Sequence, residues 1–333
     1  MADLSRKRAR TELAEESDET SNEVLESILR AARRMWQRDP DVKRATSSEE
    51  KDFRSHFGCS PPVCATLWNH LQVTDLSPQG GTLDHLLWAL MFLKIYGKQR
   101  QMCTLAGGVD QDTFRKWTWL FLNAIVQLEP LVVRICLLIS YICLILIILF
   151  SLQIIWNNRL KNDQGNDCLI SVDGTDFMIQ ELGRDFYSYK FKRSGLRYEV
   201  GLCILTGDIV WINGPYAPGL YNDLQIFRDS LISQLEPNER VEADDGYRGE
   251  HPQYVKCPAG FCNPEETKEM QSRVRSRQET TNRRFKKSGC MKQVWRNKIL
   301  AHSIAFRAIE IVSQLQINAG ERLFQVDYND LYA

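Results

Sequence analysis

A run of eleven residues from Leu169 to Ile179, Leu-Ile-Ser-Val-Asp-Gly-Thr-Asp-Phe-Met-Ile, constrains the fold of this chain most. It alternates and is rich in β-branched residues, so it predicts a buried strand that carries the carboxylate of Asp173. Further strand-like runs lie at 187–192, 198–205, 208–213, 240–244 and 254–257, and helical patterns dominate residues 264–316. Strands followed by interleaved helices predict an α/β fold with a mixed sheet flanked by helices.

Three more acidic residues stand at the beginnings or ends of predicted elements, or within a basic helix. Asp223 opens a helical stretch after a turn rich in Pro and Gly, Asp244 ends the run 240–244, and Glu279 lies in a strongly basic helix. The separations from Asp173 onward are 50, 21 and 35 residues, so only a tertiary fold can bring the four carboxylates together.

A cluster of carboxylates predicts a site for divalent metal ions. Carboxylates in one pocket repel each other unless cations neutralise them, and Mg²⁺ and Mn²⁺ prefer carboxylate oxygens as ligands. Two such ions can promote phosphoryl transfer by activating a water or hydroxyl and stabilising the leaving oxygen. The alternative is that these are ordinary surface acids, because the chain has 42 Asp and Glu residues.

Four segments resemble the catalytic core of Harbinger-type (PIF/Harbinger) DDE transposases. They are Ser171-Val-Asp-Gly-Thr-Asp-Phe177, Gly214-Pro-Tyr-Ala-Pro-Gly-Leu-Tyr-Asn-Asp223, Ala243-Asp-Asp-Gly-Tyr247 and the basic segment Arg273–Phe285. The resemblance covers residues 165–315, with a looser match over 52–130. It implies an RNase H-like core, a DDE superfamily endonuclease activity and a Mg²⁺ or Mn²⁺ cofactor.

The same resemblance implies a role for each acid. Asp173 and Asp223 match the first two metal-binding catalytic acids, and Asp244 matches the third, with Asp245 next to it as an alternative. Glu279 matches the acid of the late helix, for which Glu265 and Glu266 are weaker candidates. The implied partners are DNA (transposon ends or a genomic target) and a Myb-like DNA-binding protein, and a homo-oligomer stays open. A domesticated DNA-binding or adaptor protein without catalysis is the alternative function.

The charge distribution supports a nucleic-acid partner although the formal net charge is zero. Residues 273–287 contain seven Lys or Arg and one acid, Glu279. A strip of this kind predicts contact with a phosphate backbone, and a solvated helix face is the alternative.

The N-terminal part predicts a flexible charged arm over 1–50, with one helix in 21–38, followed by a helical domain over 52–130. The basic run Arg6–Arg10 favours import into the nucleus. Helices are expected at 83–96, at 99–105 and from 113 onward. The last two, joined by a Gly-containing turn, predict a helix-turn-helix in which Arg115 and Lys116 contact phosphates. A plain helical bundle is the alternative.

Residues 135–155 contain no charged side chain over 21 positions, which by length and hydropathy makes them a transmembrane candidate. A second hypothesis is that residues near 134–153 are a translated intron, and a buried helix is the third. A genuine span would place the protein at a membrane and not in the nucleus. The remaining residues, 316–333, are expected to be a tail.

Overall fold

The computed structural model describes residues 22–42, 45–129, 156–157, 159–160, 167–258 and 265–328. They fall into two compact units, Met1–Ile125 (unit 1) and Val126–Ala333 (unit 2). The basic run 6–10 and the apolar segment 135–155 lie outside the described residues, so both interpretations stay predictions. Among the helices that are described, none is long and apolar enough to cross a membrane.

Unit 1 is built from helices. Its described elements are a helix over 22–35, α2 (Thr46–Phe57), α3 (Pro61–Val73), α4 (Leu83–Ile95), α5 (Gln99–Leu105) and α6 (Gln111–Gln127). Helix α6 begins two residues earlier than expected because the Asp110 side chain accepts hydrogen bonds from the backbone N–H groups of residues 112 and 113, both at 2.9 Å. The buried aromatic side chains of unit 1 include Phe53, Trp88 and Phe121. The helix-turn-helix interpretation of α5 and α6 stays a prediction.

The described part of unit 2 contains a six-stranded mixed sheet, which confirms the predicted class of mixed α/β fold. Its strands are β1 (Cys168–Met178), β2 (Tyr187–Ser188), β3 (Arg193–Cys203), β4 (Ile209–Tyr216), β5 (Arg240–Glu242) and β6 (Val255–Lys256). Strand β3 runs antiparallel to β1, β2 and β4, whereas β5 runs parallel to β1 and to β6. The run 187–192 yields only two strand residues because 189–192 form the turn into β3.

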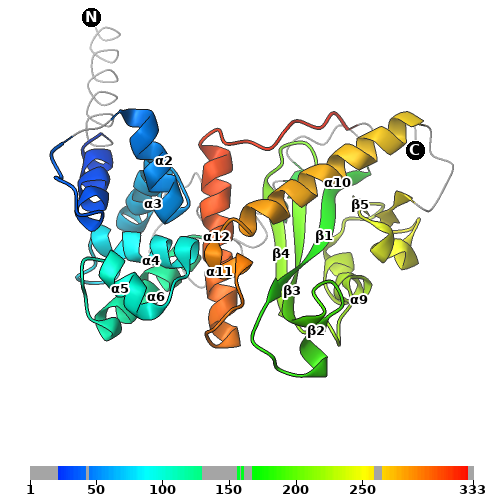
Figure 1. Cartoon of the computed structure of the whole chain (residues 1–333). Coiled ribbons are helices and arrows are strands. Elements are labelled where there is room, and N and C mark those ends of the chain that lie inside the picture. Colours follow the sequence, from blue (N-terminus) through cyan, green and yellow to red (C-terminus); the bar gives the residue numbers. More distant parts are fainter. Residues whose placement is uncertain are drawn as a thin grey trace, which may run out of the picture. The chain divides into compact units, whose positions relative to one another are not determined.

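Helices cover this sheet on its faces. They are α9 (Asp223–Asp229), α10 (Glu265–Phe285), α11 (Gly289–Lys292) and α12 (Ile299–Asn318). Helix α10 crosses the strands and contacts β1, β5 and α12, and α12 packs on β4 (Figure 1). Three 3-10 helices, η3 (Arg184–Phe186), η4 (Leu231–Gln234) and η5 (Asp245–Glu250), complete the described elements.

Apolar side chains fill both faces of the sheet. On one face, Ile170 and Val241 of the sheet belong to the same cluster as Phe227 of α9. On the other face, Phe177 and Tyr198 pack on Phe306 of α12, with ring centroids 5.0 and 4.3 Å apart. Such aromatic pairs contribute about 1 kcal/mol each beyond the burial of their area. The sheet therefore has an apolar layer on each face, against which α9 and α12 pack.

The expected tail is part of the fold as far as residue 328. Val326 is fully buried, and the Tyr328 hydroxyl donates to Glu242 Oε1 at 2.5 Å. The segment after α12 therefore packs next to β5.

Candidate active site

The first two predicted acids lie on either face of β1. Asp173 lies in the middle of β1, points toward α10 and is followed by Gly174. A Cβ atom on Gly174 would lie only 1.9 Å from Asp223 Oδ1, so the Asp223 carboxylate rests against the β1 backbone on the face opposite to the Asp173 side chain. A side chain at position 174 would displace it, which explains why glycine stands between two acids on this strand.

The beginning of α9 fixes the Asp223 carboxylate. Asn222 caps the helix, because its Oδ1 accepts a hydrogen bond from the backbone N–H of Gln225 at 2.8 Å. Asp223 is the first helical residue, where the helix dipole stabilises negative charge. The cap predicted from the sequence is thus present, and it orients Asp223 toward β1.

Asp244 lies just beyond the carboxyl end of β5, which pairs with the first half of β1. Strand β5 pairs in parallel with β1, with Ser171 opposite Glu242. Two residues further along each chain come Asp173 and Asp244, so the two acids lie at the same level. Asp244 is not a strand residue as predicted: β5 ends at Glu242, and Asp244 caps η5 by accepting the Gly246 N–H at 2.9 Å.

The three aspartates form one electrostatic cluster. Burial raises the pKa of Asp173 to about 6; Asp244 and Asp223 add to the rise, and Lys190 opposes it. Burial also raises the pKa of Asp223, with Asp176 and Asp244 adding to the rise and Arg197 opposing it. Because the charge of Asp244 acts on both other acids, the geometry favours Asp244 over Asp245 as the third member.

Glu279 does not join this cluster. Its side chain is 71% exposed and lies 4.0 Å from Arg283 on the next turn of α10. The face of α10 that meets the sheet carries Gln278 and Asn282 instead: Gln278 accepts from the Ser171 hydroxyl at 2.9 Å, and the Asn282 amide donates to Asp173 Oδ2 at 2.6 Å. The side chains of Glu265 and Glu266 lie outside the described ones.

A buried ion pair between Arg197 and Asp176 lies next to Asp223. Arg197 on β3 donates to both carboxylate oxygens of Asp176, at 2.7 and 3.0 Å, and its third nitrogen lies 3.4 Å from Asp223 Oδ1. Asp176 is 1% exposed and also accepts from the Ser188 hydroxyl at 2.6 Å. Arg197 therefore links the structural acid Asp176 to the site acid Asp223.

Another buried carboxylate, Glu199, stands opposite Gly174 in the β1–β3 register and is 1% exposed. Its Oε2 accepts from the Trp211 indole N–H at 2.9 Å. Burial raises the pKa of Glu199 to about 8, the Trp211 hydrogen bond opposes the rise, and Asp223 adds to it. Glu199 is therefore protonated at neutral pH in the folded protein.

Glu199 should make stability depend on pH. The pKa of Glu199 in the folded protein lies above the value of about 4.3 in an unfolded chain. The stabilisation that Glu199 adds to the free energy of unfolding is therefore complete below about pH 4 and is lost as pH rises through about 8. We expect Glu199→Gln to remove this dependence. The free energy of unfolding of the variant relative to the wild type should grow by about 1.4 kcal/mol per pH unit between about pH 5 and 8. Urea unfolding of the wild type and the variant at about pH 5 and at about pH 8, in EDTA, measures this change. If the two proteins differed in free energy of unfolding by the same amount at both pH values, the raised pKa of Glu199 would be contradicted.

The donor set at the site suits a hard divalent cation. One buried oxygen there, Asn282 Oδ1, accepts no hydrogen bond in the described structure, and a second, Asp223 Oδ1, accepts none but lies 3.4 Å from Arg197. Buried polar atoms of this kind need compensation, and oxygen-rich sites of one or two carboxylates with retained water are typical for Mg²⁺. Within the described ranges no group of three or more His, Cys, Asp or Glu side chains is placed so that it could hold a metal ion. The three aspartates are thus electrostatic neighbours and not an assembled metal site.

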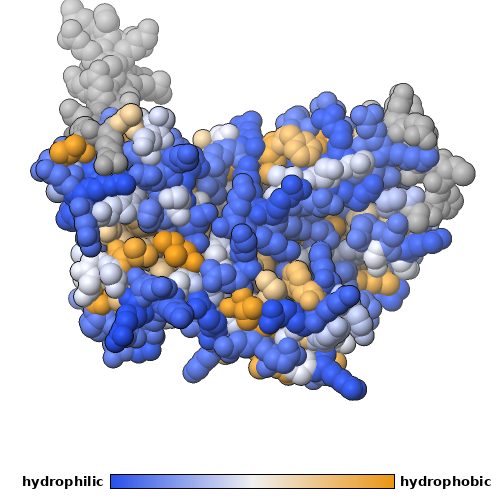
Figure 2. Space-filling model, viewed as in Figure 1, coloured by the Kyte–Doolittle hydropathy of each residue, from blue (hydrophilic) through white to orange (hydrophobic). Residues whose placement is uncertain are grey.

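The predicted basic strip on α10 has two kinds of members. The buried Arg277 side chain donates to the carbonyls of Cys203 and Ile204, and Arg284 donates to the Glu321 carbonyl at 2.7 Å. Both guanidinium groups are thus bonded to backbone carbonyls, and Arg277 is buried whereas Arg284 is half-buried. Arg283, by contrast, is 73% exposed, and hydrophilic side chains cover most of the surface along α10 (Figure 2).

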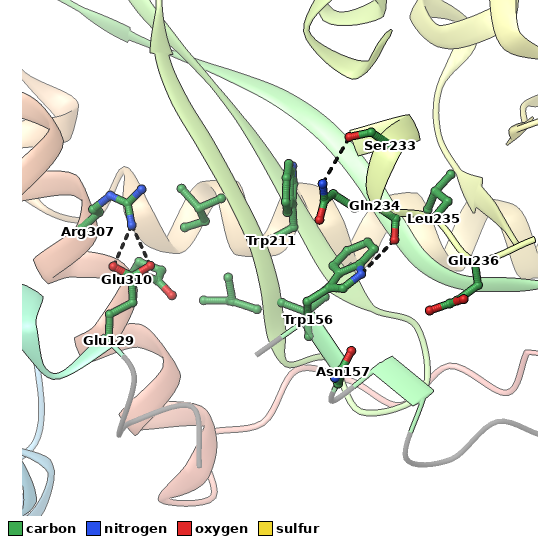
Figure 3. Close-up of a pocket in the computed structure, with 13 residues that line it drawn as sticks. Glu129, Trp156, Asn157, Trp211, Ser233, Gln234, Leu235, Glu236, Arg307 and Glu310 are labelled. Carbon is green, nitrogen blue, oxygen red and sulfur yellow. Dashed lines mark hydrogen bonds and ion pairs between the residues drawn. The ribbon is translucent and has the colours of Figure 1, made fainter. Parts of the chain in front are cut away.

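A cavity of about 760 Å³ lies on unit 2 and is lined by none of the predicted site residues. Trp156 and Trp211 face it with ring centroids 5.6 Å apart, and Arg307 donates to both oxygens of Glu129 at 2.6 and 2.7 Å (Figure 3). Burial and the charge of Glu129 raise the pKa of the neighbouring Glu310 well above its usual range. The cavity is separate from the aspartate cluster.

The sequence did not single out Asn282, Arg197, Glu199 or Lys190 as site residues. Helical spacing could have found Asn282, because it lies four residues after Gln278 on one face of a predicted helix. Strand alternation could have indicated that Arg197 and Glu199 share a face, but pattern alone does not name their partners. Lys190 lies in a turn, where no periodicity applies.

Comparison of the chain with protein-family models, with curated proteins and with solved structures finds no match.

Proposed function

We propose that this chain is a divalent-metal-dependent DNA endonuclease of the Harbinger type, able to cleave phosphodiester bonds and to transfer strands. The observation that carries the proposal is that Asp173, Asp223 and Asp244, from three separate elements, lie close enough for their charges to interact. The sheet itself supports an RNase H-like core, because β1, β3 and β4 form an antiparallel meander and β5 and β6 extend it in parallel beyond β1.

The three aspartates would hold Mg²⁺ or Mn²⁺ through carboxylate oxygens. When bound, such ions make water a stronger nucleophile and stabilise the leaving oxygen of a phosphodiester. The chain itself orients the ligands: Asn282 holds Asp173 through its amide, and Arg197 holds Asp223. The positive charge of Lys190 acts on both Asp173 and Asp223, so it would attract the phosphate to the site.

DNA is the substrate that the charges around the site favour. Exposed Arg283 lies on the helix that crosses the site, and Lys286, half-buried, is close enough to Asp173 and Asp176 to feel their charges. Positive side chains beside an acidic cluster suit a phosphate backbone held over it. A nuclear location, for which the basic run Arg6–Arg10 speaks, is part of the same proposal. A Myb-like partner and a homo-oligomer are further parts that rest on the resemblance.

A non-catalytic DNA-binding protein is the second candidate. It is favoured by one observation, the position of Glu279 away from the three aspartates. In that case the aspartates would be a remnant that no longer assembles a complete site.

Cleavage of supercoiled plasmid by the purified chain tests the proposal. We expect nicking with Mg²⁺ or Mn²⁺ that stops in EDTA, and calorimetric binding of Mn²⁺ by the protein alone. The variant Glu279→Gln tests whether Glu279 is the fourth acid of the site. A loss of cleavage as large as that of Asp223→Asn would mean that Glu279 turns inward when the ion binds. Unchanged cleavage would limit the site to the three aspartates. Absence of both Mn²⁺ binding and cleavage in a folded sample would favour the non-catalytic protein.

A further inference from the structure

The turn between β2 and β3 exposes an aromatic ring among basic residues. It reads Tyr189-Lys-Phe-Lys192, followed by Arg193. Tyr189 is 82% exposed, and its ring centroid lies 5.2 Å from that of Tyr187 in an edge-to-face arrangement. Lys190, Lys192 and Arg193 are all exposed. The turn thus presents a solvent-exposed ring that contacts a second ring and is followed at once by three exposed cations.

This turn is fastened to the aspartate cluster. Ser188, at its base, donates to Asp176 Oδ2 at 2.6 Å, and Asp176 is paired with Arg197, which contacts Asp223. Lys190 lies near enough for its charge to oppose the rise that burial causes in the pKa of Asp173 and Asp223. Tyr189 therefore stands next to a residue whose charge reaches the site where a scissile phosphate would lie.

A second segment with exposed aromatic and apolar side chains is hydrogen-bonded to the chain just before this turn. The segment before α9 exposes Leu220 (61%) and Tyr221 (37%), and the Tyr221 ring centroid is 5.3 Å from that of Tyr216. The backbone N–H of Gly219 donates to the Asp185 carbonyl at 2.9 Å, which joins this segment to η3, just before β2. Tyr221 is two residues from Asp223, so rings occur on both segments that border the acids.

Aromatic rings beside cations are the features that bind unpaired nucleotides. A base stacks on a ring whatever its identity, and Lys and Arg hold the adjoining phosphates. A paired duplex hides its base faces, so a ring at this position gains a stacking partner only when a base has left the helix. The positive charge of the turn matches a phosphate backbone better than it matches a protein surface of mixed charge.

We propose that Tyr189 is a stacking platform for an unpaired base next to the scissile phosphate, so that the preferred substrate is DNA with an unpaired or displaced nucleotide at the cleavage position. The position of the scissile phosphate rests on the proposed nuclease function. Binding of the unpaired base does not, because it needs neither metal nor cleavage.

Binding of the full chain to fluorescent DNA in EDTA tests the platform. The probes are a fully paired duplex and the same duplex with one unpaired nucleotide, followed by anisotropy. We expect Tyr189→Ala to weaken binding of the unpaired probe about 10-fold and to leave the paired duplex unchanged, since stacking on one ring accounts for a loss of that order. Tyr189→Phe keeps the ring and should retain the preference. Val73→Ala, at an 86% exposed position in unit 1, is the control for a general surface change.

The outcomes separate this inference from the nuclease proposal. Equal affinity of Tyr189→Ala and the wild type for the unpaired probe, or equal weakening on both probes, overturns the platform even if cleavage occurs. A Tyr189-dependent preference in a protein that never cuts DNA supports the platform and counts against the nuclease. Lys190→Gln should weaken both probes alike and reduce the salt dependence of binding, because it contacts phosphate and not base.

Discussion

Replacing Asp223 with Asn should lower Mg²⁺- or Mn²⁺-dependent cleavage by about 10³-fold or more while the protein stays folded. Asn keeps the size of the side chain, so its contact with Gly174 is retained. It removes the negative charge that a divalent ion requires. The free energy of unfolding should change by less than about 1 kcal/mol, because the variant loses both repulsion from Asp244 and attraction to Arg197.

Single-turnover cleavage and urea unfolding of the same sample measure the two effects of Asp223→Asn. Asp229→Asn is the matched control: Asp229 is an exposed acid on the same helix, and its Oδ1 accepts from Gln225 at 2.7 Å. It should cleave DNA at the wild-type rate. Cleavage by Asp223→Asn within about 10-fold of the wild type would remove Asp223 from the metal site.

Replacing Arg197 with Gln should destabilise the protein by about 3–5 kcal/mol. Asp176 is 1% exposed, and Arg197 is bonded to both of its oxygens. Without the guanidinium, Asp176 keeps the Ser188 hydroxyl as its described partner and is left as a buried charge. Cleavage should fall as well, because the contact with Asp223 is lost at the same time.

Chemical unfolding of a double-mutant cycle checks this second prediction. Adding Asp176→Asn to Arg197→Gln removes the uncompensated charge and should restore about half or more of the lost stability. Arg228→Gln is the comparison, because the Arg228–Glu250 pair is partly exposed (45% and 17%) and should cost less than about 1 kcal/mol. A loss below about 1 kcal/mol for Arg197→Gln would show that Asp176 takes up a proton or another partner instead.

Much of unit 2 was predictable because its signals are local. The run Leu169–Ile179 is a strand in the structure, as β1, and Asn222 caps α9 as its side-chain chemistry predicts. Cap and strand preferences depend on a few neighbouring residues, so they survive folding unchanged. The end of β5 was less predictable. The sequence pattern extends the strand to Asp244, but β5 ends at Glu242 and Asp244 caps η5.

The fourth acid shows where local signals stop. The helix that carries Glu279 was expected, but its rotation about its own axis was not. That rotation follows from how Val274, Gln278 and Asn282 pack on the sheet, and each of them is buried. Glu279, one residue further on than Gln278, is turned away by the helical period of 3.6 residues. A motif that fixes sequence spacing does not fix which side of a helix meets its neighbour.

The sequence by itself determined the acid-bearing strand, the capped helix at Asp223, the mixed class of the sheet and the residues from which a metal site would be drawn. The tertiary structure alone decided that the charges of Asp173, Asp223 and Asp244 interact, that Asn282 and not Glu279 contacts Asp173, and that Arg197 links Asp176 to Asp223. The reason is physical. Strands and caps arise from interactions over a few residues, whereas these contacts span from 21 to 109 residues and depend on strand register and helix rotation.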